Sequence, residues 1–234
     1  MVEIAKINKK IKSFSRRNVL ELLAFSICFA LLFFALKDVL INQVIAGWDT
    51  GPHFYIFSKM LEFLRGGHIT GYDPNWFAGY PTFSFYGPLP YMIMALVHFI
   101  SFGLLGSAFS FNLVLFLIPF VFLCAVFYTS RIYFGKIPSI IAIIFATMLL
   151  FYSKDHAMYG IGIHSIVYLG LFANFMAISL LIFLIGNLEK LRKTLKMKYM
   201  LINGLLLAMI ILTHSITMIF SGIVLGIFTL TNFR

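Results

Sequence analysis

Charged residues are scarce in this sequence. Only 11% of the 234 residues are Asp, Glu, Lys or Arg, whereas hydrophobic residues account for 61%. A soluble domain carries about 25% charged residues, because its surface has to contact water. The shortage of charge therefore excludes an ordinary soluble domain and predicts a protein whose solvent is lipid.

Cysteines and acidic residues are scarce as well. Cys28 and Cys124 both lie within apolar runs, so we predict neither a disulfide bond nor a metal site from them. The 8 acidic residues are outnumbered by 18 basic ones, which gives a net charge of +10. The basic residues fall in short runs between apolar segments, as in loops held at an anionic membrane surface. We therefore predict membrane lipids as partners and no nucleic acid.

Long apolar segments alternate with short polar ones along the whole chain. The first follows a basic N-terminus at residues 1–18 and lacks the small-residue cleavage pattern of a signal peptide, so we predict that it is retained as a span. At about 1.5 Å per residue, about 20 helical residues cross a hydrocarbon core of about 30 Å. We therefore predict an all-α, polytopic membrane protein with a single domain over residues 1–234. About six transmembrane helices are expected, at about residues 19–41, 107–129, 137–153, 165–188, 199–213 and 215–232.

Residues 88–102 decide the topology, because they form either a span or a helix that lies at the interface. As a span, they would put the basic residues of 131–136 and 189–198 outside, against the positive-inside tendency. As an interfacial helix, they leave 14 of the 18 basic residues in the cytoplasm. We therefore predict a multi-pass protein of the cell membrane with a cytoplasmic N-terminus. Its external loop at residues 42–106 is expected to carry one or two interfacial helices, and all six histidines and five of the eight acids then lie on the external side.

Near its beginning, the external loop contains residues typical of a helix start, and two of them are candidate functional residues. Pro52 follows a potential cap at Asp49 or Thr50, and the apolar residues of 54–65 share one face. Asp49 is either an N-cap or a carboxylate directed at a membrane-embedded substrate. His53 lies four residues later and could share that site, although one Asp/His pair alone is weak support for a metal.

Two further segments combine helix breaks with aromatic or polar side chains. In residues 73–91, Pro and Gly alternate with aromatic residues, which predicts an irregular loop that is an interfacial anchor or one wall of a pocket. Tyr80 and Tyr86 are its candidate substrate contacts. His214 interrupts the uncharged residues 199–233 and is predicted to lie at a turn between two helices. A histidine there is costly unless it is paired, so it either has a functional role or, with neighbouring Ser and Thr, satisfies the backbone at the break.

These motifs together resemble the GT-C superfamily of membrane glycosyltransferases, and within it the branch called "6-pyruvoyl-tetrahydropterin synthase-related" membrane proteins, near the YfhO-like group. The resemblance begins with Trp48 and Asp49 after the first span. It includes residues 76–91, with their Gly-Tyr-Pro and Tyr-Gly-Pro-Leu-Pro-Tyr motifs. It continues in the Arg-x-x-Phe-Gly-Lys turn at residues 131–136 and in the Leu-Thr-His-x-x-Thr break at residues 212–217.

The resemblance implies an activity and a catalytic pair. The activity is transfer of a sugar from a polyprenyl-phosphate donor to an acceptor at the external membrane face. Asp49 is implied as general base or metal ligand, and Asp155 as a second acid. A divalent metal held by Asp49, Asp155 or His53 is the one cofactor that the resemblance leaves open.

The resemblance also implies contacts with the substrate. Lys154 and Arg65 would offset the charge of the leaving phosphate, or else be an interfacial anchor and a helix C-terminal charge. His156 would contact substrate or lie in a solvated loop. His214 would contact substrate from the turn between the last two helices.

The sequence departs from the superfamily in its length. Enzymes of the superfamily are usually much longer, so we expect this chain to be an N-terminal fragment that lacks a C-terminal half, a split reading frame, or a minimal module that needs a partner subunit. A soluble pterin synthase needs a histidine zinc cluster in a small α/β domain, and the sequence offers no such context. Two other functions stay open, namely a lipid or glycolipid transporter and a non-catalytic membrane subunit. The predicted topology places no charge mid-membrane, which counts against an ion-coupled transporter.

Overall fold

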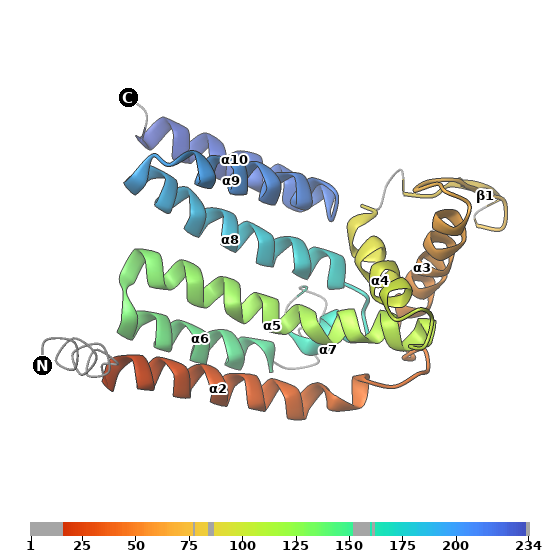
Figure 1. Cartoon of the computed structure of the whole chain (residues 1–234), viewed down its shortest axis with the longest axis horizontal. Coiled ribbons are helices and arrows are strands. Elements are labelled where there is room, and N and C mark those ends of the chain that lie inside the picture. Colours follow the sequence, from red (N-terminus) through yellow and green to blue (C-terminus); the bar gives the residue numbers. More distant parts are fainter. Residues whose placement is uncertain (1–15, 77, 84–86, 152–159, 161, 233–234) are drawn as a thin grey trace, which may run out of the picture.

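In the computed structural model, the protein is a bundle of α-helices with a smaller helical layer at one end (Figure 1). The structure describes residues 16–76, 78–83, 87–151, 160 and 162–232. Long uncharged runs of Leu, Ile, Phe and Ala favour helices, because a segment in lipid has to pair its own backbone N–H and C=O groups. The bundle helices are α2 (Arg16–Leu36), α5 (Ser107–Phe134), α6 (Lys136–Leu150), α8 (Phe172–Thr194), α9 (Met197–Ile211) and α10 (Ser215–Asn232).

Neighbouring bundle helices run side by side. The packing order is α2, α6, α5 and α8, and both α9 and α10 pack against α8 (Figure 1). Gly135 lies between α5 and α6 with a φ of 86°, a left-handed conformation that glycine adopts without strain. The chain therefore reverses within one residue, and α6 packs back along α5.

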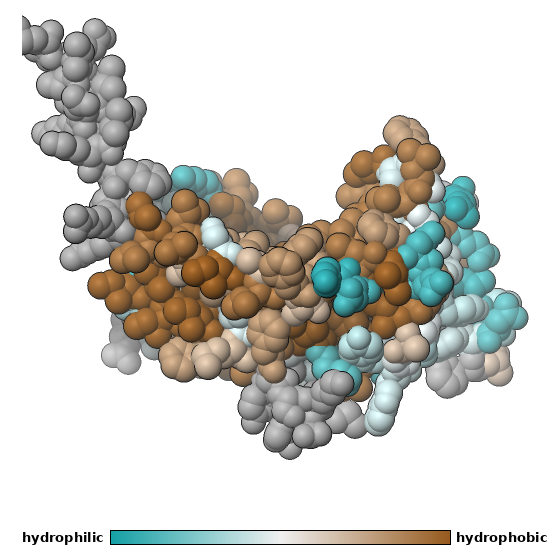
Figure 2. Space-filling view, turned by 90° about the horizontal axis from the view of Figure 1, so that it is seen from below, coloured by the Kyte–Doolittle hydropathy of each residue, from teal (hydrophilic) through white to brown (hydrophobic). Residues whose placement is uncertain are grey.

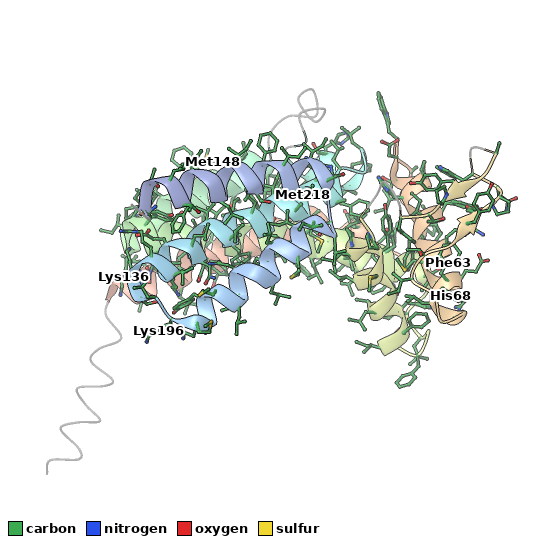
Figure 3. The ribbon with its side chains drawn as sticks, turned by 90° about the horizontal axis from the view of Figure 1, so that it is seen from above. Phe63, His68, Lys136, Met148, Lys196 and Met218 are labelled. Carbon is green, nitrogen blue, oxygen red and sulfur yellow. The ribbon has the colours of Figure 1, made fainter. Side chains whose placement is uncertain are left out.

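The two ends of the bundle differ in charge. One end, which we call the basic end, holds the start of α2, the α5–α6 and α8–α9 connections and the end of α10 (Figure 1). Lys136 and Lys196 lie at this end, whereas Phe63 and His68 lie at the other, which we call the loop end (Figure 3).

Hydrophobic side chains cover most of the bundle flank in Figure 2, and hydrophilic ones gather toward the loop end. Such a flank suits a lipid environment.

The loop end carries a layer that crosses the direction of the bundle (Figure 1). Its helix α4 has 12 residues and is about 18 Å long, too short to cross a hydrocarbon core of about 30 Å. This length favours the interfacial interpretation of residues 88–102. The elements at this end are η1 (Lys37–Val39), α3 (Thr50–Arg65), β1 (Tyr72–Asp73), β2 (Tyr80–Pro81), α4 (Leu89–Ile100) and α7 (Ile163–Val167), and β1 and β2 pair antiparallel.

The predicted all-α membrane fold is confirmed, whereas the number of spans stays a prediction. Four helices among the described residues are long and apolar enough to cross a membrane: Val19–Val39, Ser107–Phe134, Phe172–Thr194 and Ser215–Asn232. The helices α6 and α9 lie beside them, but each has 15 residues and a length of about 22 Å. Residues 165–188 do not form one helix, because α7 ends at Val167 and α8 begins at Phe172.

An aromatic cluster joins the loop end to the bundle. Phe57 of α3, Tyr91 of α4, Phe111 of α5 and Phe172 of α8 are all fully buried. The ring centroid of Phe111 lies 5.9 Å from those of both Phe57 and Phe172, and the ring of Tyr91 lies 6.0 Å from that of Phe172. Buried aromatic pairs at such distances add to the stability gained from their burial. The two crossing helices therefore share one core with α5 and α8.

Candidate functional site

A short segment before α3 is fastened to the turn between α7 and α8. The backbone N–H of Trp48 donates to the carbonyl of Tyr168 at 2.8 Å, and the hydroxyl of Thr50 donates to the carbonyl of Val167 at 2.8 Å. Gly47 lies so close to the Tyr168 carbonyl that a Cβ on it would come within 2.3 Å. Asp49 lies between these fixed points and is held in place by its backbone.

The Asp49 side chain itself is exposed. The residue occupies the N-cap position of α3, but its carboxylate makes no capping hydrogen bond. Its backbone carbonyl accepts the N–H of His53 at 2.9 Å, which starts the helix. The carboxylate therefore projects from a rigid support at the loop end and is accessible to a ligand.

His53 lies beneath Asp49 and is buried. Its Nδ1 is 2.6 Å from the hydroxyl of Tyr91, and its ring packs edge-on against Phe172 with centroids 4.9 Å apart. Burial lowers the pKa of the imidazole to about 4, although the charge of Asp49 and a hydrogen bond to the backbone of Gly170 oppose this shift. His53 is therefore neutral at pH 7 and joins α3, α4 and α8 from inside the core.

His214 lies at the turn between α9 and α10. Its Nδ1 is 3.0 Å from the hydroxyl of Thr217 and accepts the Thr217 backbone N–H at 3.4 Å, so the imidazole caps α10. The Thr217 hydroxyl donates to the amide oxygen of Asn174 at 3.3 Å. Burial lowers the pKa of His214. Asn174, His214 and Thr217 lie at the edge of a cavity of about 410 Å³. Its other lining residues are Ile178, Leu181, Ile216, Phe220, Ile223 and Val224.

The first turn of α8 separates the two histidines. Phe172 contacts His53, and Asn174 contacts Thr217 beside His214. Residues two apart on an α-helix point about 200° away from each other, so the two contacts lie on opposite sides of α8. The structure thus brings Asp49 and His53 together and places His214 across α8 from them.

The remaining candidate residues are more scattered. Arg65 is exposed in the last turn of α3, and Tyr80 is partly buried in β2. The loop before α4 reaches the His214 turn, because the N–H of Leu89 donates to the carbonyl of Leu212 at 2.9 Å. The other candidates lie outside the described residues, and they are Tyr86, Lys154, Asp155 and His156.

Asp73 is a buried acid that we did not single out from the sequence. Its carboxylate accepts hydrogen bonds from the Tyr55 hydroxyl at 2.6 Å and the Asn75 N–H at 3.0 Å, and lies 4.0 Å from the Lys59 amine. Burial alone would raise the pKa of this carboxyl, but the two hydrogen bonds and the lysine charge lower it overall. The Asp-Pro-Asn sequence is a turn signal that could have pointed to the side-chain bond with Asn75.

Asp73→Ala is expected to lower the free energy of unfolding by about 1–3 kcal/mol, because it leaves the Tyr55 hydroxyl and the Asn75 N–H without their acceptor. Thermal unfolding in detergent measures this change. Glu62→Ala is the control, because it removes only the exposed ion pair with Lys59 and should cost less than about 1 kcal/mol. Equal losses for both variants would contradict a supporting role for Asp73.

Metal-binding groups are sparse in the part of the chain that the structure describes. No group of three or more His, Cys, Asp or Glu residues there could hold a metal ion. Asp49 and His53 are neighbours, but the His53 ring already bonds to Tyr91 and to the backbone of Gly170. The described residues thus offer one accessible ligand, Asp49, at this position.

The apolar flanks and the helical bundle define this chain as an all-α integral membrane protein. More narrowly, it belongs to the family described as "6-pyruvoyl-tetrahydropterin synthase related domain; membrane protein", which it matches over residues 83–234. No curated protein and no solved structure matches the chain. The matched range contains α4 to α10 and His214, whereas Asp49, His53 and Arg65 precede it. The family resemblance is confirmed at this level, and its extension to glycosyltransferases stays a prediction.

Proposed function

We propose that the protein is a membrane glycosyltransferase module that transfers a sugar from a polyprenyl-phosphate donor to an acceptor at the loop end. The observation that carries this proposal is Asp49, an exposed carboxylate fixed by its backbone neighbours to the α7–α8 turn. The basic end is cytoplasmic in this proposal, in accordance with the positive-inside tendency, so the reaction takes place at the external face.

Asp49 is the general base of the proposed reaction. It takes the proton from the acceptor hydroxyl as the acceptor oxygen bonds to the anomeric carbon of the sugar. The bond from this carbon to the phosphate oxygen breaks, and polyprenyl phosphate leaves with the bonding electrons. Arg65 and the predicted Lys154 would offset the negative charge on the departing phosphate.

The cavity beside His214 supports the lipid part of the proposal. Its walls are apolar side chains of α8 and α10, namely Ile178, Leu181, Ile216, Phe220, Ile223 and Val224. Its polar edge consists of Asn174, His214 and Thr217 at the loop end. An isoprenoid chain would fit the apolar walls, and the polar edge would hold its phosphate at headgroup level. The same cavity would also serve a lipid transporter, so the chemistry at Asp49 has to be tested separately.

Asp49→Asn tests the proposal, because it keeps the shape of the side chain and removes the base. The measurement is release of polyprenyl phosphate from a panel of polyprenyl-phosphate hexoses and pentoses, with the chain in membranes that supply the acceptor and any partner subunit. The variant is expected to lower transfer by about 100-fold or more. Asp38→Asn is the matched control, because Asp38 is an exposed acid in η1 at the same end and should leave transfer unchanged.

Two results would overturn the proposal. Full transfer by Asp49→Asn would exclude Asp49 as the base. The absence of transfer from every donor by the wild-type membranes, together with binding of the donors, would instead indicate a non-catalytic lipid-binding subunit or a transporter.

A further inference from the structure

A cavity at the basic end lies away from the proposed sugar-transfer site. It has a volume of about 490 Å³, with α8 as its floor and with α10 and the end of α5 as its walls. We propose that it binds one anionic phospholipid, with the phosphate headgroup at Arg192 and the acyl chains along α8 and α10. The lining residues are Tyr133, Ile185, Leu188, Glu189, Arg192, Val224, Ile227, Phe228, Thr231 and Asn232.

The cavity is divided into an apolar and a polar part. Ile185 and Leu188 of α8 and Val224 and Ile227 of α10 form the part nearer the middle of the bundle. Ile227 is 58% exposed, so this part opens on the flank that faces lipid in a membrane. The polar side chains lie toward the helix ends, which is the order of acyl chain and headgroup in one leaflet.

The Arg192 side chain is oriented so that it can bind an anion. Its Nε and Nη2 donate to the two oxygens of Glu189 at 2.7 and 2.6 Å, and this fork fixes the plane of the guanidinium. The Nη1 group takes no part in the fork, and the side chain is 44% exposed. An arginine oriented in this way presents its outer N–H groups to phosphate in a fixed geometry.

The charge of the surroundings favours an anionic lipid. Glu189 also pairs with Lys193 at 3.1 Å, so one carboxylate faces two cations. Lys196, which precedes α9, and Lys198, in its first turn, add further positive charge, and residues 195–198 contain no acid. Basic residues at this level attract anionic lipids, whereas a zwitterionic headgroup brings no net charge to neutralise them.

A helix from a partner protein is a poorer occupant of this cavity. A packed apolar helix would cover Arg192 and Glu189 together with the apolar walls, and burying charged groups in an apolar interface is costly. The two flexible acyl chains of a phospholipid would fill the space between the same apolar walls and leave the charged groups at the water interface.

The test compares dioleoyl-phosphatidylglycerol with dioleoyl-phosphatidylcholine on the full chain purified in a neutral detergent. Native mass spectrometry counts the bound lipid as each is titrated. The wild-type chain is expected to retain phosphatidylglycerol at about tenfold lower concentration than phosphatidylcholine, and Arg192→Gln should abolish this preference. Lys196→Gln is the matched control, because Lys196 is exposed at the same end, does not line the cavity and carries the same charge (Figure 3). It should change the preference by less than about twofold.

A second variant tests the acyl-chain part without altering the charge. Ile227→Trp fills the apolar groove from its exposed side and should weaken phosphatidylglycerol binding with Arg192 intact. Equal losses for Arg192→Gln and Lys196→Gln would overturn the proposal, because the attraction would then be diffuse. An unchanged affinity of Ile227→Trp, or full competition by inorganic phosphate at the same concentration, would overturn it as well. So would binding of a second copy of the chain in place of lipid.

Discussion

Gly170→Ala is expected to lower the free energy of unfolding by about 3 kcal/mol or more, because two costs add at this position. The glycine has a φ of 76°, where a residue with a Cβ is strained. The added Cβ would also lie 2.7 Å from the His53 ring, 2.8 Å from the Asp49 Cβ and 3.1 Å from its carbonyl carbon. The backbone atom cannot move away, because Trp48 and Thr50 fasten the segment on either side of it.

Gly67→Ala separates the two costs at Gly170. Gly67 has nearly the same φ, 78°, but a Cβ there would meet nothing within 4 Å. Its substitution should therefore cost only the backbone strain, about 1–2 kcal/mol. Thermal or chemical unfolding of both variants in the same detergent measures the difference. Equal losses of unfolding free energy in the two variants would show that the α7–α8 turn does not pack closely against Asp49 and His53.

Acidification from pH 7 to pH 4 is expected to remove about 3 kcal/mol of stability through His53. Its pKa is lowered from 6.5 to about 4 by burial, so the folded protein resists a proton that the unfolded chain accepts readily. Between these two values the unfolded state binds more protons, and stability falls as the pH falls, by about 1.4 kcal/mol for each unit of the difference. His214, whose pKa is also lowered by burial, adds to the loss in the same direction.

The measurement is the unfolding free energy of the wild type and of His53→Gln at pH 7 and at pH 4. The variant should be less stable at pH 7, because it loses the ring contact with Phe172, and its loss on acidification should be smaller by about 3 kcal/mol. His68→Gln is the control, because His68 is exposed and should keep the full acid sensitivity. The same loss on acidification in His53→Gln and in the wild type would contradict this role of His53.

Composition predicted a membrane protein, because a chain with so little charge cannot cover a water-facing surface, and the length of the apolar segments predicted that it is all-α. The helix signal around Pro52 likewise placed α3, which begins at Thr50 and ends at Arg65. The burial of His53 could also have been predicted, since it lies one turn before Phe57 and two turns before Leu61 on the apolar face of this helix.

Other features depend on contacts between distant parts of the chain. The break between α7 and α8 arises where Gly170 packs against Asp49, and the apolar residues 165–188 contain no signal strong enough to end a helix there. Asn174 is one of several polar residues in that run, and its role follows from Thr217, which is 43 residues away. The role of Asp73 is equally hard to predict from the sequence, because only folding brings this residue beside Tyr55 and Lys59.

The fastening of Trp48 to the α7–α8 turn also has a spectroscopic consequence. The chain has two tryptophans, and both belong to the loop end, because Trp48 precedes α3 and Trp76 lies between β1 and β2. Trp48 is 72% exposed next to Asp49, whereas Trp76 stacks on Tyr55 with ring centroids 5.1 Å apart. Tryptophan fluorescence therefore reports on this end alone, and its exposed component comes from the residue beside the proposed base. A donor lipid that reaches Asp49 should shift the Trp48 emission to shorter wavelength without any added label.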